Sequence, residues 1–481
     1  MVDDSDKFKS LAETLGEKNV KTEPKITAQY AVDNVPPHGV VFPKSTDQVA
    51  EVVKFANQQR LAIVVRGSGT KMAMGNPPQK LDMVVCTSRM NHMLDVDTSN
   101  LTMTVEAGVK FRDIQARLAT QEDRCYLPLE DLEAEGDEII CSDRSHSGCF
   151  IPIDPPYADK ATIGGIIATN STGPRRLLYN LPRDCIIGIR VVAPNGDILG
   201  SGGKTVKNVS GYDVSKLMVG SMGTLGILCE MTIRMLPLPE KMATLLVSFA
   251  NVADASAFAE GIFETRLLPA AVEIMNAEAY SHLSLDDIPD FGSKDYIAAV
   301  ALEAFEPAVA RMRTEILTMA QKSGAGADTV LEEQDHRSFW LAMSNLPATL
   351  DKKFSGLIKA KLNYPLSRSR NIIETGESIF SQANLDYSVQ THAGNGICFT
   401  GLLIDHRDTA ATDKAVAAMA QLLGRCRKMD GNLVIQSAPT QVKGKLKMWG
   451  EIGSDFVVMK RLKDRLDPNG IMSPGRFVEG L

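Results

Sequence analysis

The first half of the chain arranges apolar and polar positions in a way that predicts short helices and strands. Residues 43–60 carry apolar side chains at helical spacing, and Ser45 and Gln48 have the spacing of a capping box at the start of that helix. The apolar run 61–65 predicts a strand that leads into glycines. Further elements are expected as strands at 82–88 and 101–108 and as a helix at 111–119. This part of the chain has the pattern of a compact α+β unit.

In the second half of the chain, a segment rich in small residues is followed by longer predicted strands and helices. Residues 160–239 are rich in small side chains and contain a predicted hairpin that turns at Asn195 and Gly196. After Pro239, strands are expected at 244–249, 270–276, 296–305, near 327, at 356–364 and as a pair within 387–405, and helices at 252–265, 306–322, 366–383 and 413–429. Two rounds of strands and helices predict one antiparallel sheet covered by helices on one face.

Composition narrows the class of protein. The 481 residues exceed what one hydrophobic core supports, so at least two domains are expected. A net charge of −7 without a basic stripe gives no reason to expect nucleic acid as a partner. Eight cysteines without a CxxC pair indicate neither a disulfide framework nor a zinc ribbon. The acidic start and the lack of a long apolar run predict a cytoplasmic protein, which can still lie at the inner membrane through partners.

Glycines follow the first apolar run at residues 66–70, which read Arg-Gly-Ser-Gly-Thr. A Walker loop would need a terminal Gly-Lys-Ser/Thr, which this segment lacks. A Rossmann loop would need a third glycine that opens a helix, and residues 71–78 cannot start a regular helix. The segment is then either a surface turn or a nest of backbone N–H groups that holds an anion.

Five segments taken in order carry a family resemblance: PKSTDQVAEVVKFA, VVRGSGT, ATIGGIIATNSTGPRR, GGKTVKNVSGYDVSKLMVGSMGTLGIL and DPNGIMSPGRF. Together they resemble the vanillyl-alcohol oxidase family, also called the p-cresol methylhydroxylase (PCMH) type. The resemblance implies an α+β protein in which a two-part PCMH-type FAD-binding domain precedes a ferredoxin-like, antiparallel-sheet cap domain. The expected limits are an N-terminal extension at 1–35, the FAD domain at 36–239 with an insertion at about 121–151, the cap at 240–452, and a helix and tail at 453–481 that return to the FAD domain.

The resemblance also implies which residues hold FAD. The loop 66–70 would wrap the pyrophosphate, residues 162–165 and 168–173 would pack along the cofactor, and residues 223–227 would serve its adenosine half. The expected contacts are Arg66, Gly67, Ser68, Gly69, Thr70, Thr162, Gly164, Gly165, Ala168, Thr169, Gly173, Gly223, Gly226 and Ile227. No histidine lies close to the glycine loop in sequence, so the FAD is expected to be non-covalent.

Within the family, the chain is similar to the FAD-binding subunits of glycolate oxidase and D-lactate dehydrogenase. Those enzymes oxidise a 2-hydroxy acid to a 2-oxo acid and pass a hydride to flavin N5. The resemblance therefore implies a small 2-hydroxy acid as substrate, an iron–sulfur subunit that takes the electrons, and a second flavin subunit as a further partner.

The chain departs from the catalytic relatives at their metal site. Those relatives use His-x-Gly-Asp-Gly-Asn-x-His and a later Glu-His-Gly, whereas this chain has THAGNGICF, with Asn395 for the Asp and Phe399 for the second histidine. The single remaining imidazole, His392, is a poor metal site, so no metal is expected. The smaller flavin subunit of bacterial glycolate oxidase is similar in this departure and in the Ala-Pro…Trp-Gly stretch found here at residues 438–450.

A 2-hydroxy acid needs a cation for its carboxylate and a base for its hydroxyl proton. Lys361, Arg368 and Arg370 lie at an expected strand-to-helix junction of the cap. Lys361 and Arg368 are the candidates for the carboxylate, and His392 is the candidate base. The alternative is that these cations form a solvated helix start, which is favoured for Arg370, and that His392 is a satisfied strand residue.

The insertion contains Cys125, Cys141, His146 and Cys149, which in principle could ligate a metal. Their spacing fits no compact motif, and cysteines are common in buried loops. An acidic loop that docks a redox partner is expected here, with a plain surface excursion as the alternative.

Two functions stay open at this point. The first is an FAD-dependent dehydrogenase of a small 2-hydroxy acid, working within a complex. The second is an FAD-bearing electron-relay or assembly subunit that does not itself oxidise substrate. The broken metal motif favours the second function, whereas His392 and the basic residues near Lys361 favour the first.

Overall fold

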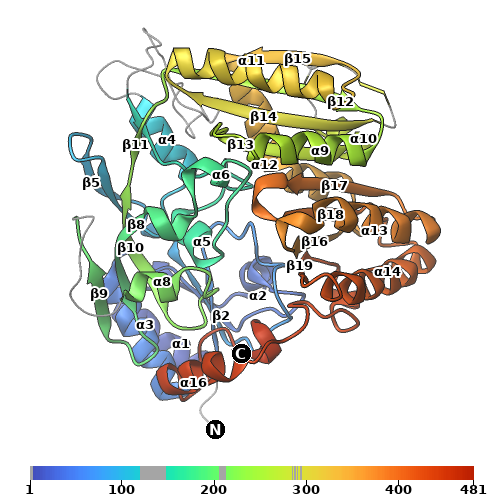
Figure 1. Cartoon of the computed structure of the whole chain (residues 1–481). Helices are drawn as coiled ribbons and strands as arrows, with labels where there is room; N and C mark the ends of the chain where they lie inside the picture. The colour runs from blue at the N-terminus through green and yellow to red at the C-terminus, as the bar shows by residue number, and fades with distance from the viewer. Residues whose placement is uncertain are drawn as a thin grey trace.

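The computed structural model describes residues 4–119, 148–204, 213–283, 285, 289, 291–292 and 295–481 (Figure 1). The N-terminal half begins with a small sheet of order β1-β2-β4-β3, in which β2, β4 and β3 run parallel. The bounds are α1 Asp4–Leu15, β1 Val20–Lys21, α2 Pro24–Thr27, β2 Gly39–Val41, α3 Thr46–Gln59, β3 Ile63–Arg66 and β4 Met83–Cys86. The apolar face of α3 packs on this sheet. Ser45 caps the helix as predicted, because its hydroxyl accepts the N–H of Gln48. The Gln48 side chain accepts the N–H of Lys44, whereas a capping box would use the N–H of Ser45.

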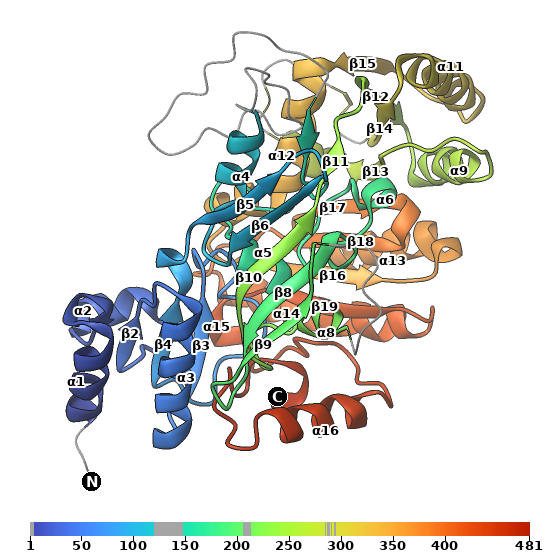
Figure 2. The same cartoon turned by 90° about the vertical axis from the view of Figure 1, so that its left-hand side faces the viewer.

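A five-stranded antiparallel sheet of order β5-β6-β10-β8-β9 stands beside the first sheet (Figure 2). Its strands and nearby elements are β5 Met93–Asp97, β6 Thr102–Glu106, α4 Phe111–Ala119, β7 Cys149–Phe150, α5 Ile163–Ala168, α6 Arg176–Tyr179, α7 Pro182–Cys185, β8 Ile186–Val192, β9 Ile198–Gly202, α8 Val214–Met218, β10 Ile227–Arg234 and β11 Leu236–Pro237. The predicted hairpin is β8–β9, and Gly196 supplies its turn with a φ of +85°. Helices α4 and α5 bury their apolar side chains in the core on this sheet.

The C-terminal half is built on one antiparallel sheet of eight strands, in the order β15-β12-β14-β13-β17-β18-β16-β19. The strands are β12 Lys241–Phe249, β13 Ala271–Asn276, β14 Tyr296–Ala304, β15 Asp328–Glu332, β16 Ile358–Asn363, β17 Tyr387–His392, β18 Ile397–Leu402 and β19 Asn432–Ser437. The predicted antiparallel sheet is therefore observed, and the α+β fold class is confirmed.

Helices cover this sheet unevenly. One face carries α9 Val252–Phe263, α11 Glu306–Lys322, α13 Ser369–Gln382 and α14 Thr409–Arg427 (Figure 2). The expectation of helices on one face only is wrong, because α12 (Glu333–Lys353) and α10 (Ala277–Ser281) pack on the other face of β12–β14. The alternation along β12 shows both contacts: Leu245 faces α9 and α11, and Leu246 faces α12. The corresponding face of β16–β19 stays open toward the first half of the molecule and lines a cavity.

The last elements return to the N-terminal half. They are α15 Thr440–Lys443 and α16 Phe456–Leu466, followed by a tail that lies against β3. Ile63 donates its N–H to the carbonyl of Ile471 at 2.7 Å, and Ser473 donates its N–H to the carbonyl of Ile63 at 2.7 Å. Lys463 fixes this tail by donating to the carbonyl of Met472 at 2.8 Å and by pairing with Asp467 at 2.7 Å.

Within the described residues, no helix has the combination of length and apolar character that crossing a bilayer requires.

A buried ion cluster joins the two halves. Arg175, which follows α5 along the chain, forms an ion pair with Glu303 of β14, and both side chains are almost fully buried. The Tyr179 hydroxyl donates to the same carboxylate at 2.5 Å, and His336 of α12 lies 3.3 Å from its other oxygen. Burial opposes ionisation, yet Arg175 and His336 hold the pKa of Glu303 at about 2. The carboxylate is therefore charged in the folded protein and links three elements.

We expect Glu303→Gln to lower the free energy of unfolding by about 3 to 5 kcal/mol, because Arg175 stays buried without its counter-charge. The pKa of Glu303 is depressed from 4.5 to about 2, so its contribution is present above pH 4.5 and is lost as the pH falls toward 2. Denaturant unfolding at pH 7 measures the loss. Glu315→Gln, which breaks an exposed pair with Arg311, is the control and should cost under about 1 kcal/mol. Equal stability of the two variants would contradict the assignment.

Candidate functional site

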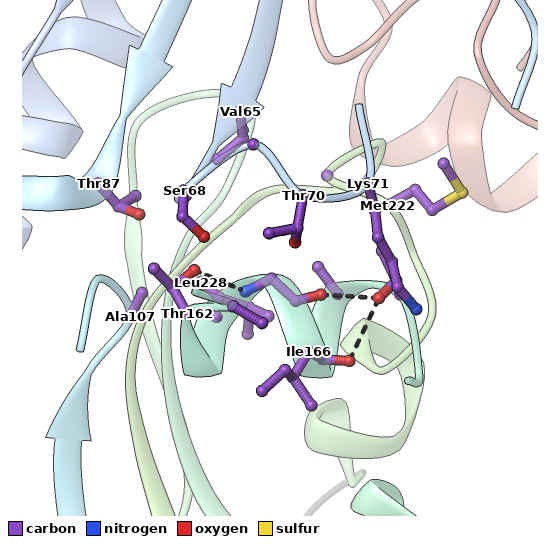
Figure 3. Close-up of a pocket in the computed structure, with 18 of the residues that line it drawn as sticks. Val65, Ser68, Thr70, Lys71, Thr87, Ala107, Thr162, Ile166, Met222 and Leu228 are labelled. Carbon is purple, nitrogen blue, oxygen red and sulfur yellow. Dashed lines mark hydrogen bonds between the residues drawn. The ribbon is translucent and has the colours of Figure 1, made fainter. Parts of the chain in front are cut away.

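A narrow cavity lies between the glycine loop after β3 and helix α5 (Figure 3). Ser68 and Thr70 lie on the loop side, and Thr162 and Ile166 lie on the helix side. The backbones approach closely, since a Cβ added to Gly67 would lie 2.0 Å from the Thr162 hydroxyl oxygen. That hydroxyl also caps α5 by accepting the N–H of the third residue along, at 3.4 Å. Glycine at position 67 is therefore a steric requirement of the cavity wall.

The loop offers hydrogen-bond donors to this cavity. In the part of the chain that the structure describes, the backbone N–H groups of Ser68, Gly69 and Thr70 donate to no other protein group. The φ of +86° at Gly69 gives the tight turn that places successive N–H groups on one side. Free donors beside small side chains fit the diphosphate of FAD, which the family resemblance implies.

Two buried cations hold the next part of the loop, residues 72–75, through its carbonyl groups. Lys443 donates to two of these carbonyls at 2.6 and 3.1 Å and pairs with Asp33 at 2.7 Å. Arg476 donates to the other two at 2.8 and 2.7 Å. The loop that would receive the diphosphate is therefore fixed by side chains from the last part of the chain.

Most of the residues expected to hold FAD line this cavity. Those that do are Gly67, Ser68, Gly69, Thr70, Thr162, Gly164, Gly165, Ala168, Thr169, Gly223 and Gly226. Gly173 lines the neighbouring second cavity instead. Arg66 and Ile227 are not among the described residues that line either space. The Arg66 guanidinium lies over the Tyr30 ring at 4.6 Å, and Ile227 is fully buried in the core between sheets.

Ser171, within the expected segment 168–173, also lines the cavity. Several lining residues were not expected from the sequence: Val65, Lys71, Met72, Thr87, Ala107, Ser221, Met222, Leu228 and Arg476. Lys71 could have been suspected from the sequence, because it is a charged residue directly after the loop that is expected to hold the FAD pyrophosphate. Val65, Ser221, Met222, Leu228 and Arg476 lie within the segments that carry the family resemblance but were not singled out. Met72, Thr87 and Ala107 lie outside those segments and meet the loop only in the folded chain.

A second cavity of about 620 Å³ continues from the first. The residues common to both are Thr70, Lys71, Pro156, Thr169, Ser171 and Met222. Its other walls are the open face of β16–β19, helix α12 and the segment that follows α5. Because the spaces are continuous, a cofactor in the first cavity can present its reacting end to a molecule in the second.

His392, the last residue of β17, lines the second cavity with 3% of its surface exposed. Its Nδ1 lies 2.7 Å from Oε1 of Glu273, which is directly opposite on β13. Gln390 donates to the other oxygen of that carboxylate at 3.0 Å, and the Phe399 ring packs on the imidazole at 5.1 Å between centroids. Burial raises the pKa of Glu273, and the two polar neighbours oppose that rise. With Nδ1 engaged, Nε2 is the ring nitrogen left for a ligand.

Four cationic side chains line the same cavity: Lys71, Arg176, Lys359 and Lys361. Lys359 pairs with Asp351 at 2.6 Å. Burial, together with the charges of Lys359 and Lys361, lowers the pKa of Lys71 to about 7. Burial and the charge of Arg176 together lower the pKa of Lys361 to about 8. The cavity is therefore an environment that favours an anionic ligand.

Two of the predicted cations lie elsewhere. Arg368 is exposed at the start of α13, and Arg370 is exposed and pairs with Glu374 at 2.8 Å. Neither is among the described residues that line the second cavity, so the assignment of Arg368 to the substrate is not supported by the geometry. The reason is that α13 turns its apolar side chains toward the sheet, which leaves these arginines on its solvent side. Arg176, from the quoted segment ATIGGIIATNSTGPRR, lines the cavity instead.

Among the described residues, no cluster of three or more His, Cys, Asp or Glu side chains is placed to hold a metal ion. Cys125, Cys141 and His146, with the acidic part of the insertion, lie outside the described residues. Cys149 is described and buried, and its Sγ lies 3.9 Å from the sulfur of Met235.

Comparison with known proteins matches both halves of the chain. The family profile described as "FAD binding domain" matches residues 37–129 and 144–202, and the profile described as "FAD linked oxidases, C-terminal domain" matches residues 238–477. The chain is 28% identical over 463 residues to glycolate oxidase subunit GlcD of Bacillus subtilis, covering 93% of this chain and 91% of that protein. It is 24% identical over 458 residues to the mitochondrial D-lactate dehydrogenase (cytochrome) of Arabidopsis thaliana, covering 92% and 73%.

Solved structures share the fold at low identity. p-Cresol methylhydroxylase with substrate bound superposes with a TM-score of 0.76 at 16% identity, covering 98% of this chain and 96% of that chain. The 4-ethylphenol oxidase of Gulosibacter chungangensis superposes with a TM-score of 0.73 at 17% identity, covering 99% and 97%. The PCMH-type fold expected from the sequence is therefore confirmed.

We expect Gly67→Ala to weaken FAD binding by about 10-fold or more, because the new Cβ would overlap the Thr162 hydroxyl, and such overpacking costs about 1 to 3 kcal/mol. The FAD-to-protein ratio after gel filtration and the quenching of FAD fluorescence on titration measure the effect. Gly424→Ala on α14 is the matched control, since an added Cβ there meets nothing within 4 Å. Wild-type FAD affinity in the Gly67 variant would show that the loop does not hold the cofactor.

Proposed function

The chain belongs to the FAD-linked oxidases, and from that membership we propose that it oxidises a small 2-hydroxy acid to the 2-oxo acid in the second cavity. Bound FAD, held by the glycine loop and α5, supplies the acceptor for the hydride on the substrate carbon. The remaining tasks fall to the side chains of this chain: to bind the carboxylate, to remove the hydroxyl proton and to limit water.

The observation that carries the proposal is the buried pair of His392 and Glu273. The carboxylate fixes the imidazole through Nδ1 at 2.7 Å and leaves Nε2 to accept the hydroxyl proton. After that transfer the imidazolium stays beside Glu273, which stabilises the positive charge where little water can do so. Phe399 and the strands around the pair limit solvent on one side. His392 is thus proposed as the catalytic base and Glu273 as its positioning residue.

Arg176 and Lys361 are proposed to bind the carboxylate next to the hydroxyl. Both line the second cavity, and neither forms an ion pair with a described carboxylate. An arginine can hold a carboxylate through two parallel hydrogen bonds, and Lys361 adds a second charge from β16. The expected role of Lys361 is retained, whereas Arg176 takes the role expected of Arg368.

The finer features of the proposal concern the cofactor and the partners. We propose non-covalent FAD, because the described lining of the first cavity contains no histidine or cysteine side chain. We also propose that the chain is one subunit of a complex, which is supported by its similarity to a glycolate oxidase subunit. An iron–sulfur subunit is proposed as the electron acceptor and a second flavin subunit as a neighbour. In this proposal the chain works in the cytoplasm or at the inner membrane through those partners.

A second candidate function is an FAD-bearing relay or assembly subunit that does not itself oxidise substrate. It is favoured by the replacement of the family's metal-binding residues, including Phe399 in the place of a histidine. In that case His392 and Glu273 would be a structural pair between neighbouring strands.

The first experiment is anaerobic addition of D-lactate, L-lactate and glycolate to the purified yellow protein, followed at the flavin absorbance. The dehydrogenase predicts bleaching with at least one acid. His392→Asn should slow that bleaching by about 10²- to 10⁴-fold, because the proton acceptor is lost. A protein that stays yellow with every 2-hydroxy acid but bleaches with dithionite would support the relay function and overturn the dehydrogenase.

Two further variants separate the cations. We expect Arg176→Met to raise KM for the acid by about 10-fold or more, because a charged contact to the carboxylate is lost. Arg368→Met should leave kcat and KM unchanged, since its side chain is exposed outside the second cavity. Steady-state reduction of a dye acceptor measures both. The reverse pattern would restore the assignment of Arg368 to the substrate.

A further inference from the structure

Helix α16 carries exposed apolar side chains on its outer face. Val457, Val458 and Leu462 expose 52%, 58% and 38% of their surfaces, and Ile452 in the preceding loop exposes 41%. Both views place this helix at the lower edge of the molecule (Figure 1, Figure 2). Single exposed apolar residues are ordinary on a protein surface, whereas several on one short helix are typical of an interaction surface.

The opposite side of the helix is fixed to the rest of the chain. Lys463 is buried there and donates to the carbonyl groups of Thr224 and Met472, each at 2.8 Å. The same ammonium group pairs with Asp467, just after the helix, at 2.7 Å. The exposed face therefore has a defined orientation, and a partner that docks on it does not have to order the helix first.

Four exposed residues form one seam along this face. Asp455, Val458, Leu462 and Arg465 follow one another at intervals of three, four and three residues, which is the spacing of a helix that packs lengthwise against another helix. Asp455 precedes the helix with helical backbone angles, a φ of −66° and a ψ of −19°, so it keeps the register of the seam. The seam is apolar in its middle, acidic at its N-terminal end and basic at its C-terminal end.

The charges at the two ends of the seam are not paired within the part of the chain that the structure describes. Neither Asp455 nor Arg465 forms an ion pair there. By contrast, Lys460, on another side of the helix, pairs with Asp464 at 2.9 Å. Arg461 lies at the edge of the seam, where its long side chain can extend into water. The charges of Asp455 and Arg465 are therefore available to a second molecule.

We propose that this seam binds a second copy of the chain, with the two α16 helices packed side by side in antiparallel directions. Val458 of one copy then lies beside Leu462 of the other, and Asp455 of one copy meets Arg465 of the other. A two-fold axis repeats each contact, so the complementary ends of the seam give two ion pairs between the copies. A parallel arrangement would bring like charges together instead.

The distribution of charge favours a second copy over a lipid surface. An anionic membrane would attract Arg465 but repel Asp455, whereas a second copy satisfies both charges. The contact is small, because α16 has 11 residues. Interfaces of this size form weak and reversible complexes, so a dissociation constant of about 1 to 100 µM is expected.

Sedimentation velocity of the full chain, at about 1 to 200 µM, tests the proposal, because a reversible dimer grows with concentration. Val458→Glu places a charge in the apolar middle of the seam and should raise the dissociation constant by about 10-fold or more. Leu268→Glu, at a leucine that is 69% exposed and lies outside α16, is the matched control and should keep the wild-type constant.

Charge reversal tests the antiparallel direction. Asp455→Arg and Arg465→Asp each bring like charges together, so each alone should raise the dissociation constant by about 10-fold or more. The double variant restores opposite charges in exchanged positions and should return to within about 3-fold of the wild type. Arg425→Asp, an exposed residue in the last turn of α14, is the control for a charge reversal at a helix end. Circular dichroism checks that each variant is folded.

Each outcome decides the proposal. A wild-type chain that stays monomeric at every concentration overturns it, and a monomer that sediments with phosphatidylglycerol vesicles assigns the face to lipid instead. A dimer that is unchanged by Val458→Glu has its interface elsewhere, which also overturns the proposal. A double charge variant that is as weak as the single variants contradicts the antiparallel contact. The wild-type concentration series needs no variant, so a misfolded variant does not remove the test.

Discussion

The buried cations of this protein donate hydrogen bonds to carbonyl groups or pair with carboxylates, and several of these contacts join the two halves of the chain. Lys443 and Arg476, from the late part of the chain, end on the carbonyl groups of residues 72–75 behind the glycine loop. Lys463 donates to two backbone carbonyls, and Arg175 forms an ion pair with Glu303 across the junction of the halves. Apart from the Lys463 bond to Met472, which spans nine residues, each of these contacts joins segments more than a hundred residues apart in sequence. An ammonium or guanidinium group away from water is costly without such partners. The shape of the first cavity depends on these contacts.

In the second cavity, by contrast, cationic side chains other than Lys359 lie without a described carboxylate partner. This lack of counter-charge makes the cavity favourable for an anionic ligand. The same residue types that hold the fold when they reach a carbonyl or carboxylate are available to a ligand where they line the cavity. The His392–Glu273 pair follows the same reasoning at a smaller scale, since the carboxylate satisfies one ring nitrogen and leaves the other open. The charged groups thus have two effects. Where they are paired they hold the fold around the site, and where they are unpaired they leave the cavity open to a ligand.

Local patterns in the sequence predicted much of the fold. The helix expected at 111–119 is α4 (Phe111–Ala119), and the hairpin turn at Asn195 and Gly196 is observed, because periodicity and turn chemistry are local. Helix α12 was missed because Pro347 and many polar residues interrupt its apolar pattern. Glu273 could not be found at all, since its contact with His392 depends on the register between strands more than a hundred residues apart. The position of Arg368 outside the second cavity could not be predicted, because its place near a strand end in the sequence does not tell which side of α13 it occupies.

The return of the chain to β3 has a consequence for biosynthesis. The loop at residues 66–75 emerges early from a ribosome, but the side chains that hold its carbonyl groups, Lys443 and Arg476, are made almost four hundred residues later. Until then, β3 also lacks its neighbour in the tail, where Ile63 pairs with Ile471. A nascent chain can therefore form its early sheets during translation, while the cofactor loop takes its final form only after Arg476 has left the exit tunnel. Loading of the flavin is in this way a late event that follows completion of the polypeptide through Arg476.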